Sequence, residues 1–169
     1  KAPALESVNF SIDKGKKVAV VGPNGGGKST LFNAIAGLIP LTEGSLTIKG
    51  KSPEEAKATV SYLPQKDLMN WNFPLSVKQV VEMGLTNRNT ISIFKRKKIN
   101  NKIEKALESV GLLQKINENI KSLSGGQLQR VLIARALAQD SDILLLDEAF
   151  SAVDVGAQED IMQLINNIN

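Results

Sequence analysis

Residues 22–29 limit what this chain can fold into more than any other segment does. They read GPNGGGKS and fit the pattern G-x-x-x-x-G-K-[ST], directly after the β-branched run at 17–21. From Ser29 onward, apolar residues recur at helical spacing until Gly37 and Pro40. A buried strand, a glycine-rich loop and a helix in this order are typical of a unit that binds phosphate.

Each residue type in this loop meets a need of a bound triphosphate. Glycines let the backbone curl so that its N–H groups point at the phosphates, and the start of the helix adds partial positive charge. Lys28 can neutralise β- and γ-phosphate oxygens, and Ser29 can ligate Mg²⁺. The alternative is a glycine-rich turn that only caps a helix, and the flanking strand and helix disfavour it. The predicted nucleotide-binding residues are Gly22, Pro23, Asn24, Gly25, Gly26, Gly27, Lys28, Ser29 and Thr30.

Strands and helices alternate along the rest of the chain. Patterns of β-branched and alternating apolar residues predict strands at 8–12, 17–21, 44–49, 58–63 and 143–147. Helical spacing predicts helices at 29–37, 76–85, 101–110, 126–139 and 156–168, with a brief helical start at 53–57. This rhythm predicts an α/β fold with a mostly parallel sheet, a small antiparallel N-terminal β part and an inserted helical subdomain.

Composition and charge fit one domain that binds a small anion. The chain has 169 residues, and 21 Lys plus Arg against 17 Asp plus Glu leave a net charge of +4, which does not demand nucleic acid. No run of residues approaches the roughly 20 apolar residues that a membrane-spanning helix needs, so we expect the chain to be soluble by itself. The absence of cysteine excludes disulfides, zinc-thiolate sites and thiol catalysis.

Two carboxylates follow the apolar run at 143–146. The edge formed by the carboxyl ends of parallel strands is where ligands bind in open α/β sheets. Asp147 can hold Mg²⁺ through water, and Glu148, next in sequence and on the opposite side, can orient or deprotonate an attacking water. Acidic residues after a strand are often only solvated, but a phosphate loop in the same chain favours the functional interpretation.

A second predicted anion site is the LSGGQ segment at 123–127. Ser124 is expected to cap the following helix and to leave the N–H groups of Gly125 and Gly126 exposed. Taken alone, Ser-Gly-Gly fits a linker with a capping residue better than an anion site.

These segments together resemble the ABC ATPase family. Residues 22–30 are similar to its Walker A loop, Gln65 to its Q-loop glutamine, 123–127 to its signature, 143–148 to its Walker B strand and 151–154 to its D-loop. The resemblance covers nearly the whole chain. It implies a P-loop NTPase (RecA-like) core in a single domain, 1–169, with 1–65 and 123–169 as the catalytic core and 66–122 as the helical subdomain.

The resemblance also implies the ligands, the partner and the residue roles. ATP and Mg²⁺ are the expected cofactors, and the expected partner is a second such subunit in a head-to-tail homodimer. ATP would lie between the Walker A loop of one subunit and Ser124, Gly125, Gly126 and Gln127 of the other, with Asp154 across the dimer. The catalytic assignments are Glu148 as base, Gln65 as γ-phosphate sensor and Lys28. The metal ligands are Ser29, Gln65 and Asp147.

Three departures from the family pattern affect these expectations. The chain contains no histidine, so the family's switch histidine has no counterpart, and the aromatic residue that stacks on adenine has none either. Ala149 stands where the family usually has proline. We therefore expect both ends to be truncated and this stretch alone to hydrolyse ATP poorly or not at all.

The segment between Gln65 and Leu123 is too short for the long coiled coil of chromosome-maintenance ATPases, which favours a transport subunit. Residues 65–84 resemble the ATPase subunits of bacterial manganese, zinc and iron uptake transporters. This implies a membrane-spanning permease partner in the groove beside Gln65, near Trp71 and Phe73, and a location on the cytoplasmic face of the cell membrane. As an alternative, Trp71 and Phe73 are ordinary core aromatics.

Two other functions stay open from the sequence. One is a non-transport ABC ATPase that acts on ribosomes or DNA, and the other is a nucleotide-binding module without turnover. The basic run at 95–98 suits anionic lipid, nucleic acid or a solvated helix flank, of which the flank is favoured. No direct binding to nucleic acid is expected.

Overall fold

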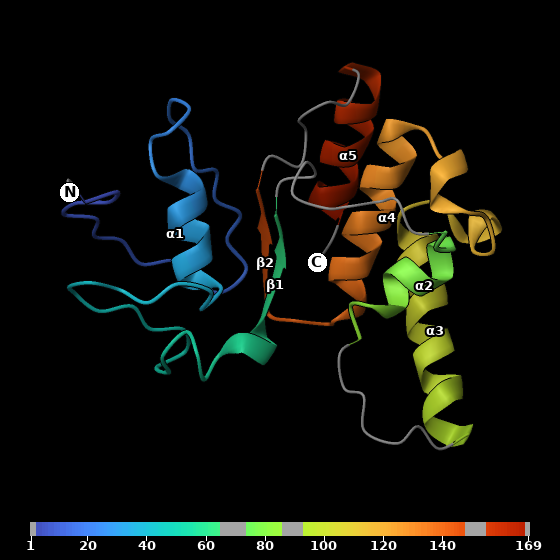
Figure 1. Ribbon diagram of the computed structural model, residues 1–169, viewed down its shortest axis with the longest axis horizontal. Helices are drawn as coiled ribbons and strands as arrows, with labels where there is room; N and C mark the ends of the chain where they lie inside the picture. The colour runs from blue at the N-terminus through green and yellow to red at the C-terminus, as the bar shows by residue number, and fades with distance from the viewer. Residues whose placement is uncertain (1–2, 65–73, 86–92, 148–154, 168–169) are drawn as a thin grey trace.

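Two parallel strands separate one helix from four others in the computed structural model, which describes residues 3–64, 74–85, 93–147 and 155–167 (Figure 1). The strands are β1 (Val60–Leu63) and β2 (Ile143–Leu146). The helices are α1 (Lys28–Ile35), α2 (Val77–Glu82), α3 (Ile93–Ser109), α4 (Gly125–Ala138) and α5 (Val155–Asn167). Short 3₁₀ turns occupy Lys57–Thr59, Leu113–Lys115 and Ile120–Ser122.

The two strands run parallel because the helices α2, α3 and α4 lie between them in the sequence and return the chain to the start of the sheet. The register pairs Val60 with Ile143 and Leu63 with Leu146. One further bond, from the Asp147 N–H to the Leu63 carbonyl at 2.9 Å, extends the pairing past β2. The α/β fold with a parallel sheet that the sequence predicted is confirmed.

Side chains alternate between the two faces of the strands. On the face toward α1, Val60 joins a small cluster that contacts Ile35, Ile143 and Leu145. On the opposite face, Leu63 and Leu146 belong to the larger core that the other four helices build. The sheet thus separates α1, with the loop that precedes it, from the helical part of the molecule.

The larger core centres on α4, which packs against α2 and α3 (Figure 1). Its fully buried side chains are Leu63, Ile103, Leu107, Leu132, Ile133, Ile161, Val77, Val80, Val81, Val110 and Val131. Gly84, just after α2, makes the close approach of α2 to α4 possible, because a Cβ there would lie 2.2 Å from the carbonyl oxygen of Arg135. Any side chain at this position would push the two helices apart.

The N-terminal β part differs from the sequence expectation. Among the residues described before β1, the strands expected at 8–12, 17–21 and 44–49 do not form, and an isolated antiparallel bridge between Ile48 and Lys51 is the pairing present. Val18 and Val21 are 59% and 88% exposed instead of buried. A β-branched run shows that a segment suits a pleated surface, but it does not supply the neighbouring strand that must pair with it.

The helices agree better with the periodicity. α1, α2, α4 and α5 lie where apolar spacing predicts them. α3 begins at Ile93, earlier than the expected start at 101. The apolar spacing did not predict its first half, because that half is basic and lacks the apolar repeat. Within the described part of the chain, none of the helices has both the length and the apolar character needed to cross a bilayer.

Candidate functional site

The phosphate loop folds tightly in front of α1, and its glycines make that fold possible. Gly25 and Gly27 have φ angles of 78° and 82°, in the left-handed region that glycine tolerates best. A Cβ on Gly27 would also lie 2.6 Å from the carbonyl oxygen of Ala4. Gly26 donates its N–H to the Pro23 carbonyl at 3.1 Å, which closes the turn. Position 27 therefore requires glycine both for its backbone angle and for the space around it.

The ammonium of Lys28 is held over this loop. Its Nζ donates to the carbonyl oxygens of Gly22 at 2.9 Å and of Pro23 at 2.8 Å. An ammonium has three donors, so one further N–H can reach an anion without breaking either contact. The loop thus places a positive charge beside a glycine backbone that has no side chains to block a phosphate group.

The start of α1 has no side-chain cap, unlike the starts of two other helices. At α2 and α4, Ser76 and Ser124 form capping boxes with Gln79 and Gln127. The residue in the same position before α1 is Gly27, and among the described residues no side chain caps the first-turn N–H groups. These N–H groups have no acceptor within the helix itself. A phosphate group fits here, because it would supply acceptors and the negative charge that a helix start favours.

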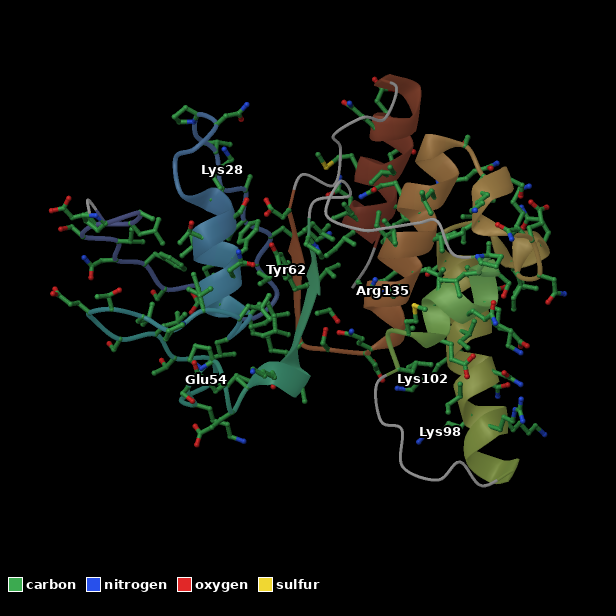
Figure 2. All side chains as sticks on the ribbon, viewed as in Figure 1. Lys28, Glu54, Tyr62, Lys98, Lys102 and Arg135 are labelled. Atoms are coloured by element: carbon green, nitrogen blue, oxygen red, sulfur yellow. The ribbon has the colours of Figure 1, made fainter. Side chains whose placement is uncertain are left out.

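Asp147 lies at the carboxyl end of β2, where it is 4% exposed. The hydroxyl of Tyr62 on β1 donates to its Oδ2 at 3.3 Å. Tyr62 projects from the sheet on the side that faces α1 and Lys28 (Figure 2). The Asp147 carboxylate therefore lies on the same face of the sheet as the phosphate loop, and the first turn of α1 and the strand ends lie at one end of the molecule (Figure 1).

Burial raises the pKa of Tyr62 to about 12, and the negative charge of Asp147 and their hydrogen bond add to the rise. The tyrosine thus stays protonated and continues to donate to Asp147 throughout the neutral range. Sequence reasoning did not predict this contact. Strand alternation indicates it once the register is known, since Tyr62 pairs with Leu145, two residues before Asp147 and on the same face.

Because Tyr62 is the single tyrosine of the chain, its ionisation can be followed by tyrosinate absorbance. In Mg²⁺-free buffer we expect a midpoint near 12 in the folded protein and near the ordinary value of 10.0 in urea. The sign follows from linkage: the raised pKa adds stability below about 10, and this contribution is lost as pH rises toward about 12. Circular dichroism at each pH verifies that the protein is folded.

An Asp147→Asn variant is the matched control, and its Tyr62 midpoint should fall toward 10.0 without reaching it, because burial remains. A midpoint near 10.0 in the folded parent protein would contradict the contact.

The LSGGQ segment forms the start of α4 as the sequence predicts. Ser124 accepts a bond from the Gln127 N–H at 3.3 Å, and Gln127 Oε1 accepts one from the Ser124 N–H at 3.1 Å. This box leaves the first two N–H groups of the helix, those of Gly125 and Gly126, without an acceptor inside the helix. A cavity of about 230 Å³ opens beside it, lined by Gly111, Leu112, Gln114, Lys115, Ser124, Gly126, Gln127 and Arg130.

The structure brings together some of the predicted site residues and separates others. The phosphate loop with α1 lies on one side of the two strands, and the LSGGQ segment with α4 lies on the other (Figure 1). Within the described residues, no hydrogen bond or ion pair joins Lys28 or Ser29 to Asp147. Gln65, Glu148 and Asp154 fall outside the described residues.

The chain matches the family model described as ABC transporter over residues 5–151, so it belongs to this family. Among solved structures, cbiO1 from Clostridium perfringens, part of the transporter complex cbiONQ, is 28% identical, with a TM-score of 0.82 over 96% of this chain and 65% of that one. The dimeric structure of a bacterial ABC transporter cassette is 33% identical, with a TM-score of 0.77 over 96% of this chain and 73% of that chain. These likenesses confirm the P-loop NTPase fold.

Curated relatives carry names from metal transport. The manganese transport system ATP-binding protein MntB of Bacillus subtilis is 41% identical over 98% of this chain and 66% of that protein. The zinc transport system ATP-binding protein TroB of Treponema pallidum is 38% identical over 98% of this chain and 62% of that protein. This chain thus spans about two thirds of the length of these relatives.

Proposed function

We propose that this chain binds Mg-ATP at the phosphate loop and hydrolyses ATP as part of a longer transport subunit. The observation that carries the proposal is the start of α1, which follows Gly27 and has no side-chain cap, together with the Lys28 ammonium held over the loop. Backbone N–H groups, a helix start and a fixed cation together match the charge and the acceptors of a triphosphate.

Magnesium ligands are assigned by their chemistry and their place in the fold. Ser29 offers a hydroxyl in the first turn of α1, and Asp147 offers a buried carboxylate on the same face of the sheet. Gln65 is assigned as a third ligand on the sequence resemblance alone. Bound Mg²⁺ would neutralise charge on the β- and γ-phosphates. Tyr62 orients the Asp147 carboxylate by its hydrogen bond, which favours one oxygen over the other for this role.

Hydrolysis is assigned to Glu148, which orients or deprotonates the attacking water, with Gln65 sensing the γ-phosphate. The second half of the site would come from another copy of the chain. Because the phosphate loop and the LSGGQ segment lie on opposite sides of the strands, one chain cannot close both around a single nucleotide. A head-to-tail homodimer, with Ser124, Gly125, Gly126 and Gln127 facing the partner's ATP and Asp154 across the dimer, supplies both halves.

Coupling to transport completes the proposal. The names of the relatives support transport of a manganese or zinc ion. We assign the direction as import, with manganese, zinc or iron as the cargo and a membrane-spanning permease as the partner. The permease would contact the groove beside Gln65, and the subunit would lie on the cytoplasmic face of the membrane. We assign residues 1–65 and 123–169 to the catalytic core and 66–122 to the helical subdomain. This division rests on the sequence resemblance, since α2 and α3 pack mainly against α4, on the other side of the assigned boundary.

The test compares this chain with a form lengthened at both ends to match its relatives, each assayed with Mg²⁺ for ATP binding and for phosphate release. We expect ATP binding by both forms and turnover by the longer form only, because this chain has no histidine to serve as the family's switch residue. A failure of both forms to bind ATP would overturn the proposal. Copurification of the longer form with RNA or DNA, lost at high salt, would favour the non-transport alternative.

A further inference from the structure

We propose that Ser61 is a positioning residue for the LSGGQ segment, since it fixes the far end of α4 to the sheet and thereby sets where Ser124 lies relative to Asp147. The inference rests on the proposed function, because it concerns the closing of two chains around ATP. Ser61 lies in the middle of β1 and is 1% exposed, on the face that points to α4.

The hydrogen bonds of Ser61 join three elements. Its Oγ lies 2.9 Å from the carbonyl oxygen of Ala136, in the last turn of α4, and it also hydrogen-bonds the side-chain oxygen of Gln139, which ends that helix. The hydroxyl of Ser141 donates to Ser61 Oγ at 2.7 Å and lies 3.1 Å from the carbonyl of Ile143, where β2 begins. The Ser61 hydroxyl donates its one proton to the end of α4 and accepts a bond from Ser141, so it links β1 to the end of α4 and to the turn after it.

Two ion pairs also reach this turn, but they are weaker constraints. Lys102 of α3 contacts Asp140 at 3.1 Å, and Lys49 contacts Asp142 at 2.7 Å. Each pair includes an exposed carboxylate, and exposed pairs contribute little to holding a geometry. The buried Ser61 group is the constraint that water does not compete with.

The geometry of α4 turns a small change at this end into a larger one at the other. The helix has 14 residues, so it is about 21 Å long at about 1.5 Å per residue. A rotation of about 10° at Gln139 would therefore move Ser124 by roughly 4 Å, which exceeds the length of a hydrogen bond. Asp147 follows β2, which begins two residues after Ser141. The junction thus contributes to the distance between the two functional ends, in addition to the packing of α4 against α2 and α3.

The experiment uses the longer form described above in a Glu148→Gln background, which retains bound ATP if the proposed function is correct. ATP-dependent dimerisation is measured by light scattering across ATP concentrations, and binding of a fluorescent ADP analogue reports the phosphate loop alone. Ser61→Ala is expected to raise the ATP concentration for half-maximal dimerisation at least about fivefold. Its affinity for the ADP analogue should stay within about twofold of the parental value. Thermal melting reports the folded fraction of each variant.

A matched control and a rescue separate positioning from general damage. Ser109→Ala removes a similar serine bond, from Oγ to the Ala106 carbonyl at 2.8 Å, within α3 and away from the junction, and it should leave dimerisation unchanged. Ser61→Thr keeps the hydroxyl and should restore most of the parental behaviour. If Ser61→Ala does not fold, Ser141→Ala removes the adjoining bond and should show the same shift.

The outcomes distinguish this inference from the function on which it rests. If the parental background binds no ATP and forms no dimer, both the proposed function and this inference are overturned. If the background dimerises and folded Ser61→Ala dimerises at the same ATP concentration, the inference alone is overturned. Equal loss of dimerisation and of ADP-analogue binding would show a structural role only and would also overturn it.

Discussion

Replacing Lys28 with alanine is expected to weaken Mg-ATP binding by about 100-fold. The ammonium lies over the phosphate loop in the structure, with its Nζ 2.9 Å and 2.8 Å from the carbonyl oxygens of Gly22 and Pro23. The third N–H of the ammonium is the donor left for a phosphate oxygen, and a hydrogen bond from a charged group contributes about 1.5–3 kcal/mol, so the loss of this bond together with the nearby positive charge corresponds to about 100-fold. Isothermal titration calorimetry with ATP and Mg²⁺ measures the change directly.

The control for this variant is Lys105→Ala, which removes the same charge from an exposed position on α3. Its ATP affinity should match that of the parent, because it differs from Lys28→Ala in position and not in charge. If Lys28→Ala bound ATP with parental affinity, the loop would not be the phosphate site, and the nucleotide would have to bind elsewhere.

Replacing Glu148 with glutamine in the full-length subunit is expected to lower ATP turnover by about 10²- to 10⁴-fold, the usual contribution of a general base. The amide cannot accept a proton from the attacking water, but it preserves the size of the side chain. ATP binding and ATP-dependent dimerisation should persist, because the phosphate loop and the LSGGQ segment are unchanged. Phosphate release and equilibrium ATP binding, measured on the same preparation, separate the two effects.

The matched control is Glu159→Gln, an exposed carboxylate on α5 with the same chemical change. Its turnover should equal that of the parent. Parental turnover by Glu148→Gln would mean that another group accepts the proton, whereas loss of ATP binding would mean that Glu148 holds the nucleotide instead.

Local sequence patterns predicted the parts of this fold that depend on near neighbours. The helix start at Ser124 follows from a capping residue and its glutamine three positions later, and the structure shows both bonds. The turn before α1 follows from glycines, which tolerate its left-handed backbone angles best. Asp147 was placed at a strand end because the apolar run before it is continuous, and β2 confirms that placement. The functional roles of these residues stay predictions.

Features that depend on distant segments could not be predicted in the same way. The strand expected at 17–21 would need a neighbour to pair with, and nothing in its own residues supplies one. The bond from Tyr62 to Asp147 joins residues far apart in the sequence, and it appears only once the register of β1 and β2 is known. In the sequence, Ser61 is one polar residue in an apolar strand. Its role is visible only when the end of α4 lies against it.

The placement of the phosphate loop and the LSGGQ segment on opposite sides of the strands has a consequence for mixed assemblies. In the head-to-tail pair proposed above, each nucleotide takes its loop from one chain and its LSGGQ segment from the other. A chain altered at Lys28 and a chain altered at Ser124 would each form a defective pair with itself. Combined, they would concentrate both defects in one of the two nucleotide sites and restore the other, so activity lost in either parent would reappear in the hybrid.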